Sequence, residues 1–181
     1  MPHRIILFRG MNTGGVRAPV ADLRAMATKM GLKTPRTLAA SGNLVVESPK
    51  ATDTLEAEIE AAMETTFGLK VAAMVRTPEQ WAALIAVNPF PKEAEDQPAR
   101  VVAMVMKDGI KAGGLEAVRA LCRDGEAVEA VGDDLFFWFP NGQGESEIFK
   151  KATPRMLGMG TGRNWNTVLK LGVMVGLEAS A

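Results

Sequence analysis

Near its start the chain reads Arg4-Ile-Ile-Leu-Phe-Arg9-Gly-Met-Asn-Thr-Gly-Gly15. Four consecutive apolar residues between two arginines predict a strand that is buried on both faces. The glycine-rich run that follows predicts a turn that ends this strand. Apolar residues then recur at helical spacing over 19–30, so we expect a helix there, with Gly31 at its C-terminal end.

The pattern after this helix predicts two more strands, a second helix and a fourth strand. Two short β segments on either side of Ser41-Gly-Asn43 are typical of a hairpin. Asp53 and Glu56 match a capping box at the start of the next helix, and 70–76 follows it as a strand. The resulting order, β-α-β-β-α-β, is that of the split βαβ or ferredoxin-like plan.

A similar order, β-α-β-β-α, recurs in the second half, although no residue-level repeat between the halves is evident. Before it, Thr77 and Gln80 match the capping box of a further helix, and the charged, proline-flanked segment 92–98 is typical of a linker. We therefore predict an α+β fold of two ferredoxin-like (split βαβ) halves with antiparallel sheets plus a C-terminal helix. The halves are expected over 1–91 and 92–181, with the C-terminal helix packing back on the first half.

Composition narrows the classes of protein and of site. Acidic and basic residues are equal in number, at 21 each, but both ends of the chain are basic and the middle is acidic. A positive patch would form if the ends met. One cysteine and one histidine leave little material for a disulfide, a zinc site or a histidine-dependent triad, so we expect no metal or cofactor and name no catalytic residue. No apolar run approaches the ~20 residues of a membrane span, which predicts no membrane partner and a cytoplasmic location.

The basic C-terminal segment contains Gly158-Met-Gly-Thr-Gly-Arg-Asn-Trp-Asn-Thr-Val-Leu-Lys-Leu171. Its glycines are expected to form a loop whose clustered N–H groups lead into a helix N-terminus, an arrangement that attracts anions. Arg163 could add a bidentate fork for a phosphate or carboxylate group. In the alternative interpretation the glycines form only a flexible loop, Asn164 is an N-cap and Trp165 belongs to the core.

Three blocks of sequence carry a resemblance to a known family. They are Leu7-Phe-Arg-Gly-Met-Asn-Thr-Gly-Gly15, Ser41-Gly-Asn43 and Arg163-Asn-Trp-Asn-Thr167. In this order and spacing they resemble the domain-of-unknown-function 1697 (DUF1697) family of uncharacterised conserved bacterial proteins. The resemblance implies an α+β fold of two ferredoxin-like halves and no established activity.

The three blocks together define the candidate ligand site. We predict that the C-terminal segment closes back onto the first half, so that both basic ends of the chain contribute to one composite site. The expected ligand is a small anion, a nucleotide or a phosphorylated metabolite. The candidate binding residues are Arg9, Asn12, Gly14, Gly15, Ser41, Asn43, Arg163, Asn164, Asn166 and Thr167.

Two other classes of function compete with anion binding. The ferredoxin-like plan is shared with RNA-recognition domains, and the strand within Phe136-Phe-Trp-Phe139 could offer a stacking platform to nucleic acid. However, 43–47 lacks the aromatic signature of those domains. The third class is a structural or interaction protein, in which Arg163, Asn164 and Asn166 only lock the two halves together. The oligomeric state and the presence of catalysis are left open.

Overall fold

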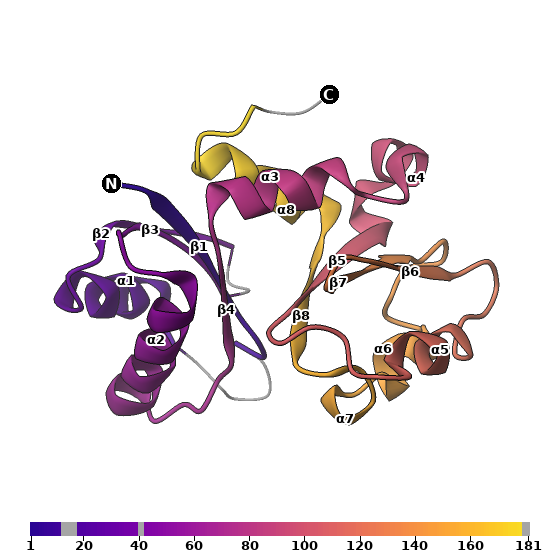
Figure 1. The fold of residues 1–181 in the computed structure, drawn as a ribbon, viewed down its shortest axis with the longest axis horizontal. Helices are drawn as coiled ribbons and strands as arrows, with labels where there is room; N and C mark the ends of the chain where they lie inside the picture. Colours follow the sequence, from indigo (N-terminus) through magenta and orange to yellow (C-terminus); the bar gives the residue numbers. More distant parts are fainter. Residues whose placement is uncertain (12–17, 40–41, 179–181) are drawn as a thin grey trace. The chain divides into compact units, whose positions relative to one another are not determined.

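The first strand predicted from the apolar run is present as β1 (His3–Phe8). The structure, a computed structural model, describes residues 1–11, 18–39 and 42–178. It divides the chain into two units, one formed by Met1–Ala83 with Leu171–Ala181 and the other by Leu84–Lys170. Each unit contains a four-stranded antiparallel sheet and several helices (Figure 1). The predicted α+β class, with antiparallel sheets, is therefore confirmed.

Unit 1 follows the predicted order of elements. Its sheet has the strand order β2-β3-β1-β4, and every neighbouring pair is antiparallel. The order β-α-β-β-α-β is that of the split βαβ plan. After β1 the elements are α1 (Val20–Lys29), β2 (Lys33–Leu38), β3 (Asn43–Glu47), α2 (Thr52–Phe67), β4 (Ala73–Arg76) and the start of α3 (Pro78–Ala86).

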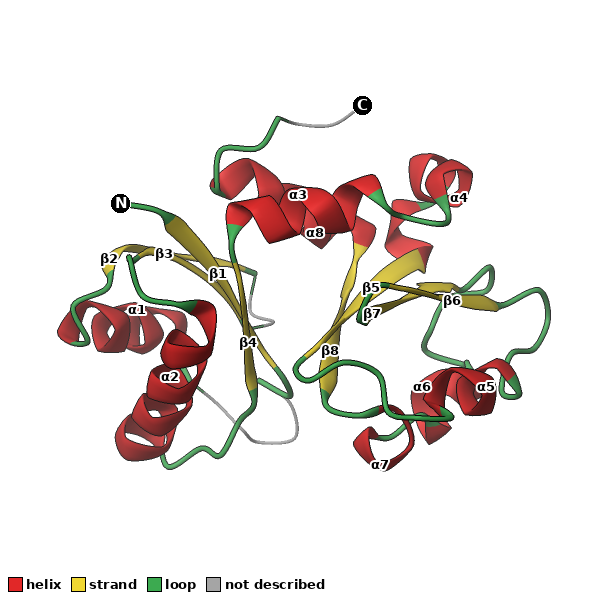
Figure 2. Ribbon diagram, viewed as in Figure 1, coloured by secondary structure: helices red, strands yellow, loops and turns green. Residues whose placement is uncertain are grey.

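Alternation along β1 sends successive side chains to opposite faces of the sheet in unit 1. Ile6 and Phe8 face α1 and α2, which cover one side of the sheet (Figure 2), and they join the core of this unit. Ile5 and Leu7 lie on the other face and are also fully buried. The expectation that this strand is buried on both faces is thus correct.

One helix start in unit 1 differs from the prediction. The capping box of Asp53 and Glu56 does not form, because α2 begins at Thr52 and Ala51 takes the N-cap position without a side-chain cap. Asp53 instead accepts a hydrogen bond from the N–H of Thr54 at 2.8 Å. Glu56 does not turn back to its own helix N-terminus. It accepts a hydrogen bond from the N–H of Val75 in the neighbouring strand β4.

Unit 2 repeats the sheet topology of unit 1. Its strand order is β6-β7-β5-β8, again antiparallel throughout. One face of this sheet carries α5, α6 and α7 (Figure 2) and a core that includes Val102, Phe137 and Leu157. The elements are α4 (Pro91–Asp96), the 3-10 helix η1 (Pro98–Arg100), β5 (Val101–Met106), α5 (Gly114–Arg119), β6 (Ala127–Val131), β7 (Asp134–Trp138), α6 (Glu147–Lys151), α7 (Pro154–Leu157), β8 (Gly160–Asn164) and the start of α8 (Trp165–Met174).

Two segments of unit 2 depart from the sequence-based expectation. The predicted linker over 92–98 contains α4 and the start of η1. Pro91 suits the first turn of α4, and Ala94 is buried, so local geometry and packing both favour helix over linker. The second departure is β8, because the sequence predicted a loop there and the unit instead gains its fourth strand.

The helices also show whether the chain contains a segment able to cross a membrane. Within residues 1–11, 18–39 and 42–178, no helix has the length and apolar character needed to cross a bilayer.

Candidate functional site

The glycine-rich run before Arg163 forms the edge strand β8. Gly160 and Gly162 lie opposite Met106 and Met104 of β5. A Cβ atom on Gly160 would lie 2.6 Å from the Met106 sulfur and 3.0 Å from the Val105 carbonyl oxygen. These glycines therefore permit close packing on β5, and the predicted loop of clustered N–H groups is wrong. Extended strand residues do not gather their N–H groups around an anion.

Arg163 lies near the end of β8 and is only 8% exposed. It pairs with Ala103 in the sheet, and Thr161 pairs with Val105. Because Val102 and Met106 face the core on the side of α5, α6 and α7, Thr161 and Arg163 lie on the opposite face of the sheet. The Arg163 Nη1 donates to Thr161 Oγ1 at 2.6 Å and to the Gly162 carbonyl at 2.9 Å.

Burial has an electrostatic consequence at this position. It lowers the pKa of Arg163 from its ordinary value to about 10, because removal from water disfavours the charged guanidinium. At pH 7 the side chain still carries its charge, since the pH lies well below either value. The fold thus holds a largely desolvated positive charge on the face of the unit 2 sheet opposite α5, α6 and α7.

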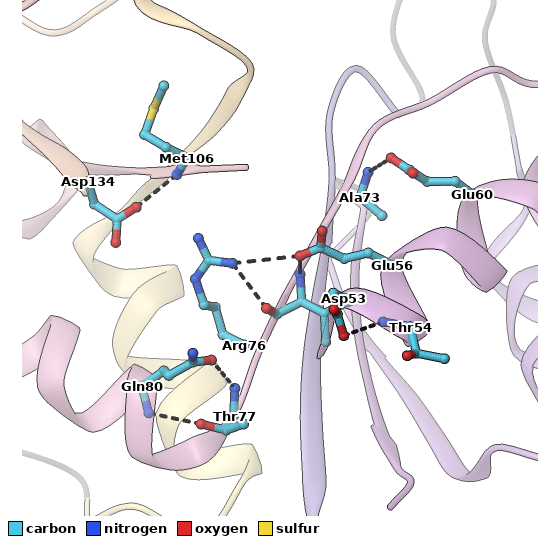
Figure 3. A network of polar contacts seen from close by, with 11 residues as sticks. Asp53, Thr54, Glu56, Glu60, Ala73, Arg76, Thr77, Gln80, Met106 and Asp134 are labelled. Carbon is cyan, nitrogen blue, oxygen red and sulfur yellow. Dashed lines mark hydrogen bonds and ion pairs between the residues drawn. The ribbon is translucent and has the colours of Figure 1, made fainter. Parts of the chain in front are cut away.

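The same arrangement occurs at the corresponding place in unit 1. Arg76 lies opposite Ile5, the third residue of β1, as Arg163 lies opposite Ala103, the third residue of β5. Each arginine donates through Nη1 to the carbonyl of its preceding residue, at 3.0 Å for Arg76 (Figure 3) and 2.9 Å for Arg163. The two halves therefore share a residue-level repeat that direct inspection of the sequence did not reveal.

The repeat extends to the residue that follows each arginine. Thr77 Oγ1 accepts the N–H of Gln80 at 3.1 Å, and Gln80 Oε1 accepts the N–H of Thr77 at 2.9 Å (Figure 3). This confirms the predicted capping box. Asn164 Oδ1 accepts the N–H of Thr167 at 3.1 Å, which confirms Asn164 as a cap of the helix it precedes. Each unit thus ends its fourth strand with an arginine and a helix cap.

The cap leads to a prediction for the polar residues on either side of Trp165. Asn164→Ala should lower the free energy of unfolding by about 1 kcal/mol, because the Thr167 N–H loses its acceptor. Asn166→Ala is the matched control, since Asn166 is exposed and should change stability by less than about 0.5 kcal/mol. Urea denaturation of both variants measures the difference, and equal effects would contradict the capping role.

The two arginines differ in their electrostatic surroundings. Arg76 Nη1 lies 3.8 Å from Glu56 Oε2, and both side chains are mostly buried. Two donor bonds of Arg163 go instead to neutral oxygens, and burial governs its pKa. In unit 2 the long helix α2 is replaced by the short α6 and α7. The repeated arginine therefore lies beside a carboxylate in unit 1, and burial lowers its pKa in unit 2.

The remaining predicted site residues divide between the units. Arg9 follows β1 and donates its backbone N–H to the Ala72 carbonyl at 3.0 Å. Asn43 is buried, and its Nδ2 donates to the Leu38 carbonyl at 3.1 Å, which links β3 to β2. Asn12, Gly14, Gly15 and Ser41 lie outside the described residues.

The structure brings some of these residues together. Arg9 and Asn43 lie at the same end of the sheet in unit 1, because Asn43 pairs with Leu7, two residues before Arg9. Arg163, Asn164 and Thr167 meet where β8 passes into α8. A single site that includes both groups stays a prediction.

Sequence reasoning missed three residues of this arrangement. Thr161 holds Arg163 through its hydroxyl group, and Arg76 with Glu56 forms the counterpart in unit 1. A usable signal was present, because an arginine followed by Thr or Asn stands directly before a helical pattern in both halves. Among the residues that the structure describes, no group of three or more His, Cys, Asp or Glu side chains could hold a metal ion.

Comparisons with known proteins establish the class of this protein. The family described as "Protein of unknown function (DUF1697)" matches residues 1–136. This range covers most of the chain, so the chain belongs to that family, as the three sequence blocks predicted. The matched range ends before Arg163. No curated protein matches the chain.

A solved structure shares the fold. The conserved bacterial protein SP0830 from Streptococcus pneumoniae aligns with a TM-score of 0.77 and 21% sequence identity. The alignment covers 96% of this chain and 98% of the other. At this level of identity the likeness concerns the fold, and it extends over both units.

Proposed function

We propose that this protein binds a small anionic ligand, a nucleotide or a phosphorylated metabolite, through Arg163. The observation that carries the proposal is the burial of a charged guanidinium on the face of the unit 2 sheet opposite α5, α6 and α7. The lowered pKa of Arg163 corresponds to a cost of roughly 3 kcal/mol for keeping the charge in the folded state. An anion that pairs with the guanidinium offsets this cost. Binding is therefore favoured, because the guanidinium is already desolvated in the folded protein.

The sign of this contribution follows from the two pKa values. Burial lowers the pKa of Arg163 in the folded protein below its ordinary value. The destabilisation is therefore fully present below about pH 10, and it fades only as the pH rises from there toward the ordinary pKa of arginine. Throughout the neutral range the folded protein carries the charge and the associated cost.

The groups around Arg163 suit an oxyanion. A guanidinium presents a planar fork of donors that matches two oxygens of a phosphate or carboxylate. Thr161 Oγ1 accepts a hydrogen bond from Arg163, so its own hydroxyl proton points elsewhere and can be donated to the same anion. Arg163 and Thr161, both on β8, thus supply a positive charge and a second hydrogen-bond donor for an anion. This chemistry supports binding, and no catalytic step is proposed.

A structural role is the second candidate, and the internal repeat favours it. Arg76 holds the same place in unit 1 and is paired with Glu56. Asn164 and Asn43 use their side chains to bind nearby backbone groups. In this role Arg163 would fasten β8 to the start of α8. Stability separates the two candidates, because a structural arginine stabilises the fold and a ligand-binding one destabilises it until the ligand is bound.

The nucleic-acid alternative has lost its main support. In unit 1 the positions of β1 and β3 on the face opposite α1 and α2 hold Ile5, Leu7, Asn43 and Val45, all buried and none aromatic. Sheets of this kind bind single-stranded nucleic acid through aromatic side chains. In unit 2, Phe137 and Phe139 stack on each other within the core, and Phe136 is fully buried. We therefore do not propose nucleic acid as the ligand.

A thermal-shift screen tests the proposed function. Inorganic phosphate, pyrophosphate and nucleoside mono-, di- and triphosphates are added to the wild-type protein and to Lys170→Ala, a control that removes an exposed charge from α8. At a ligand concentration 100 times Kd we expect stabilisation of roughly 2.7 kcal/mol, a shift of several degrees, in both proteins. The same ligand should not shift Arg163→Met. The proposal fails if no anion stabilises the wild type, or if Arg163→Met responds equally.

A further inference from the structure

The strand β4 forms one edge of the sheet in unit 1, with β1 on its other side. The Ala72 carbonyl accepts the N–H of Arg9, which lies on the side of β1. Because backbone groups alternate along a strand, the N–H groups of Ala73 and Val75 point away from β1. Such outward groups are a template on which another strand can pair.

Two glutamates of α2 occupy these outward N–H groups. Glu60 Oε2 accepts the N–H of Ala73, and Glu56 Oε2 accepts the N–H of Val75, both at 2.9 Å (Figure 3). The spacing explains the fit. Four residues of helix rise about 6.0 Å and two residues of strand rise about 6.6 Å, so successive turns of α2 meet alternate residues of β4.

Arg76 completes the cover on this edge. Its Nη1 donates to the Val75 carbonyl at 3.0 Å and lies 3.8 Å from Glu56 Oε2. The guanidinium therefore occupies an outward carbonyl and also holds the carboxylate that occupies the adjacent N–H. Carboxylates and guanidinium together reproduce the alternating acceptors and donors of a neighbouring strand.

We propose that Glu56, Glu60 and Arg76 act as a substitute strand that closes the β4 edge against pairing with a second copy of this chain. The opposite edge strand, β2, is protected by other means, because it contains Pro35 and a register shift between Lys33 and Arg36. β4 has neither, and its first three residues are apolar. A second copy is the fitting partner, since two identical edges pair antiparallel about a twofold axis.

The test removes the acceptors while it keeps the strand. The Glu56→Ala/Glu60→Ala double variant lacks both acceptors, whereas Glu56→Gln/Glu60→Gln keeps an amide oxygen at each place. Glu64→Ala is the matched control, because Glu64 lies one turn beyond Glu60, is exposed and pairs only loosely with Lys70 at 3.8 Å. Hydrogen exchange reports on the Ala73 and Val75 amides, and light scattering after size exclusion reports on the molar mass.

In the alanine double variant we expect exchange at Ala73 and Val75 to be roughly 10- to 100-fold faster, as for the loss of a hydrogen bond to a charged group. The molar mass should also rise with concentration more steeply than for the wild type. The glutamine variant should fall between the two, and Glu64→Ala should match the wild type. Exchange as slow as in the wild type, or faster exchange without association, would overturn the inference. Because it concerns unit 1 alone, the inference stands or falls separately from anion binding at Arg163.

Discussion

Gly160→Val is expected to lower the free energy of unfolding of unit 2 by about 3 kcal/mol, although valine is the better strand former. The new Cβ would lie 2.6 Å from the Met106 sulfur, 3.2 Å from the Met104 methyl carbon and 3.0 Å from the Val105 carbonyl oxygen. The methionine atoms can move, but the carbonyl belongs to the central strand β5 and cannot. The measurement is urea denaturation followed by circular dichroism.

Gly144→Val is the control for this prediction. No atom lies within 4 Å of the Cβ position at Gly144, and its φ lies outside the left-handed range. We expect its effect to be within about 0.5 kcal/mol. If Gly160→Val were as stable as the control, the run before Arg163 would not pack as a strand on β5. The glycine loop inferred from the sequence would then regain its support.

The second large effect is a contrast between the repeated arginines. Arg76→Met should lower the free energy of unfolding by about 3 kcal/mol, because it leaves the largely buried Glu56 without its ion-pair partner. Arg163→Met should leave stability unchanged or raise it by up to about 2 kcal/mol, because relief of desolvation offsets the lost hydrogen bonds. Methionine preserves most of the apolar stem in both variants.

Thermal and urea denaturation of the two methionine variants measure this contrast under the same conditions. A loss at Arg163 as large as that at Arg76 would mean that both arginines only hold their strands in place. In that case the structural role would replace anion binding as the better account of Arg163. The two arginines can be compared directly, because they share the same strand position and the same hydrogen bond to a backbone carbonyl.

Much of unit 1 could be predicted from the sequence because its signals are local. The apolar run of β1, the helical spacing of α1 and the reciprocal cap of Thr77 and Gln80 need no knowledge of distant partners. The capping box at Asp53 failed for the opposite reason. The Glu56 carboxylate could accept a hydrogen bond from a backbone N–H of its own helix or from an N–H of the edge strand β4. Which of them it bonds depends on the position of β4 in the fold.

The candidate site was harder to predict because glycine is ambiguous. The run from Gly158 to Gly162 fits a flexible loop as well as a strand that must pass close to a neighbour. The packing of Gly160 on Met106 and Val105 depends on β5, more than fifty residues earlier in the chain. The buried charge of Arg163 has the same origin, since its desolvation comes from the folded sheet. Its neighbour Asn164 was predictable as a cap because that role is local.

The asymmetry between Arg76 and Arg163 is the main reason to expect a ligand. In unit 1 the arginine at this strand position lies 3.8 Å from the Glu56 carboxylate. Unit 2 keeps the arginine and the cap but leaves the charge in surroundings that lower its pKa. Electrostatically costly groups of this kind are concentrated at functional sites.

The melting temperatures of the wild type and Arg163→Met, each with and without inorganic pyrophosphate, test this account most directly. Without pyrophosphate the account predicts that Arg163→Met melts at or above the wild-type temperature. With pyrophosphate it predicts an upward shift for the wild type alone. A variant that melts several degrees below the wild type, with pyrophosphate shifting neither protein or both equally, would contradict the claim that Arg163 is kept for an anion.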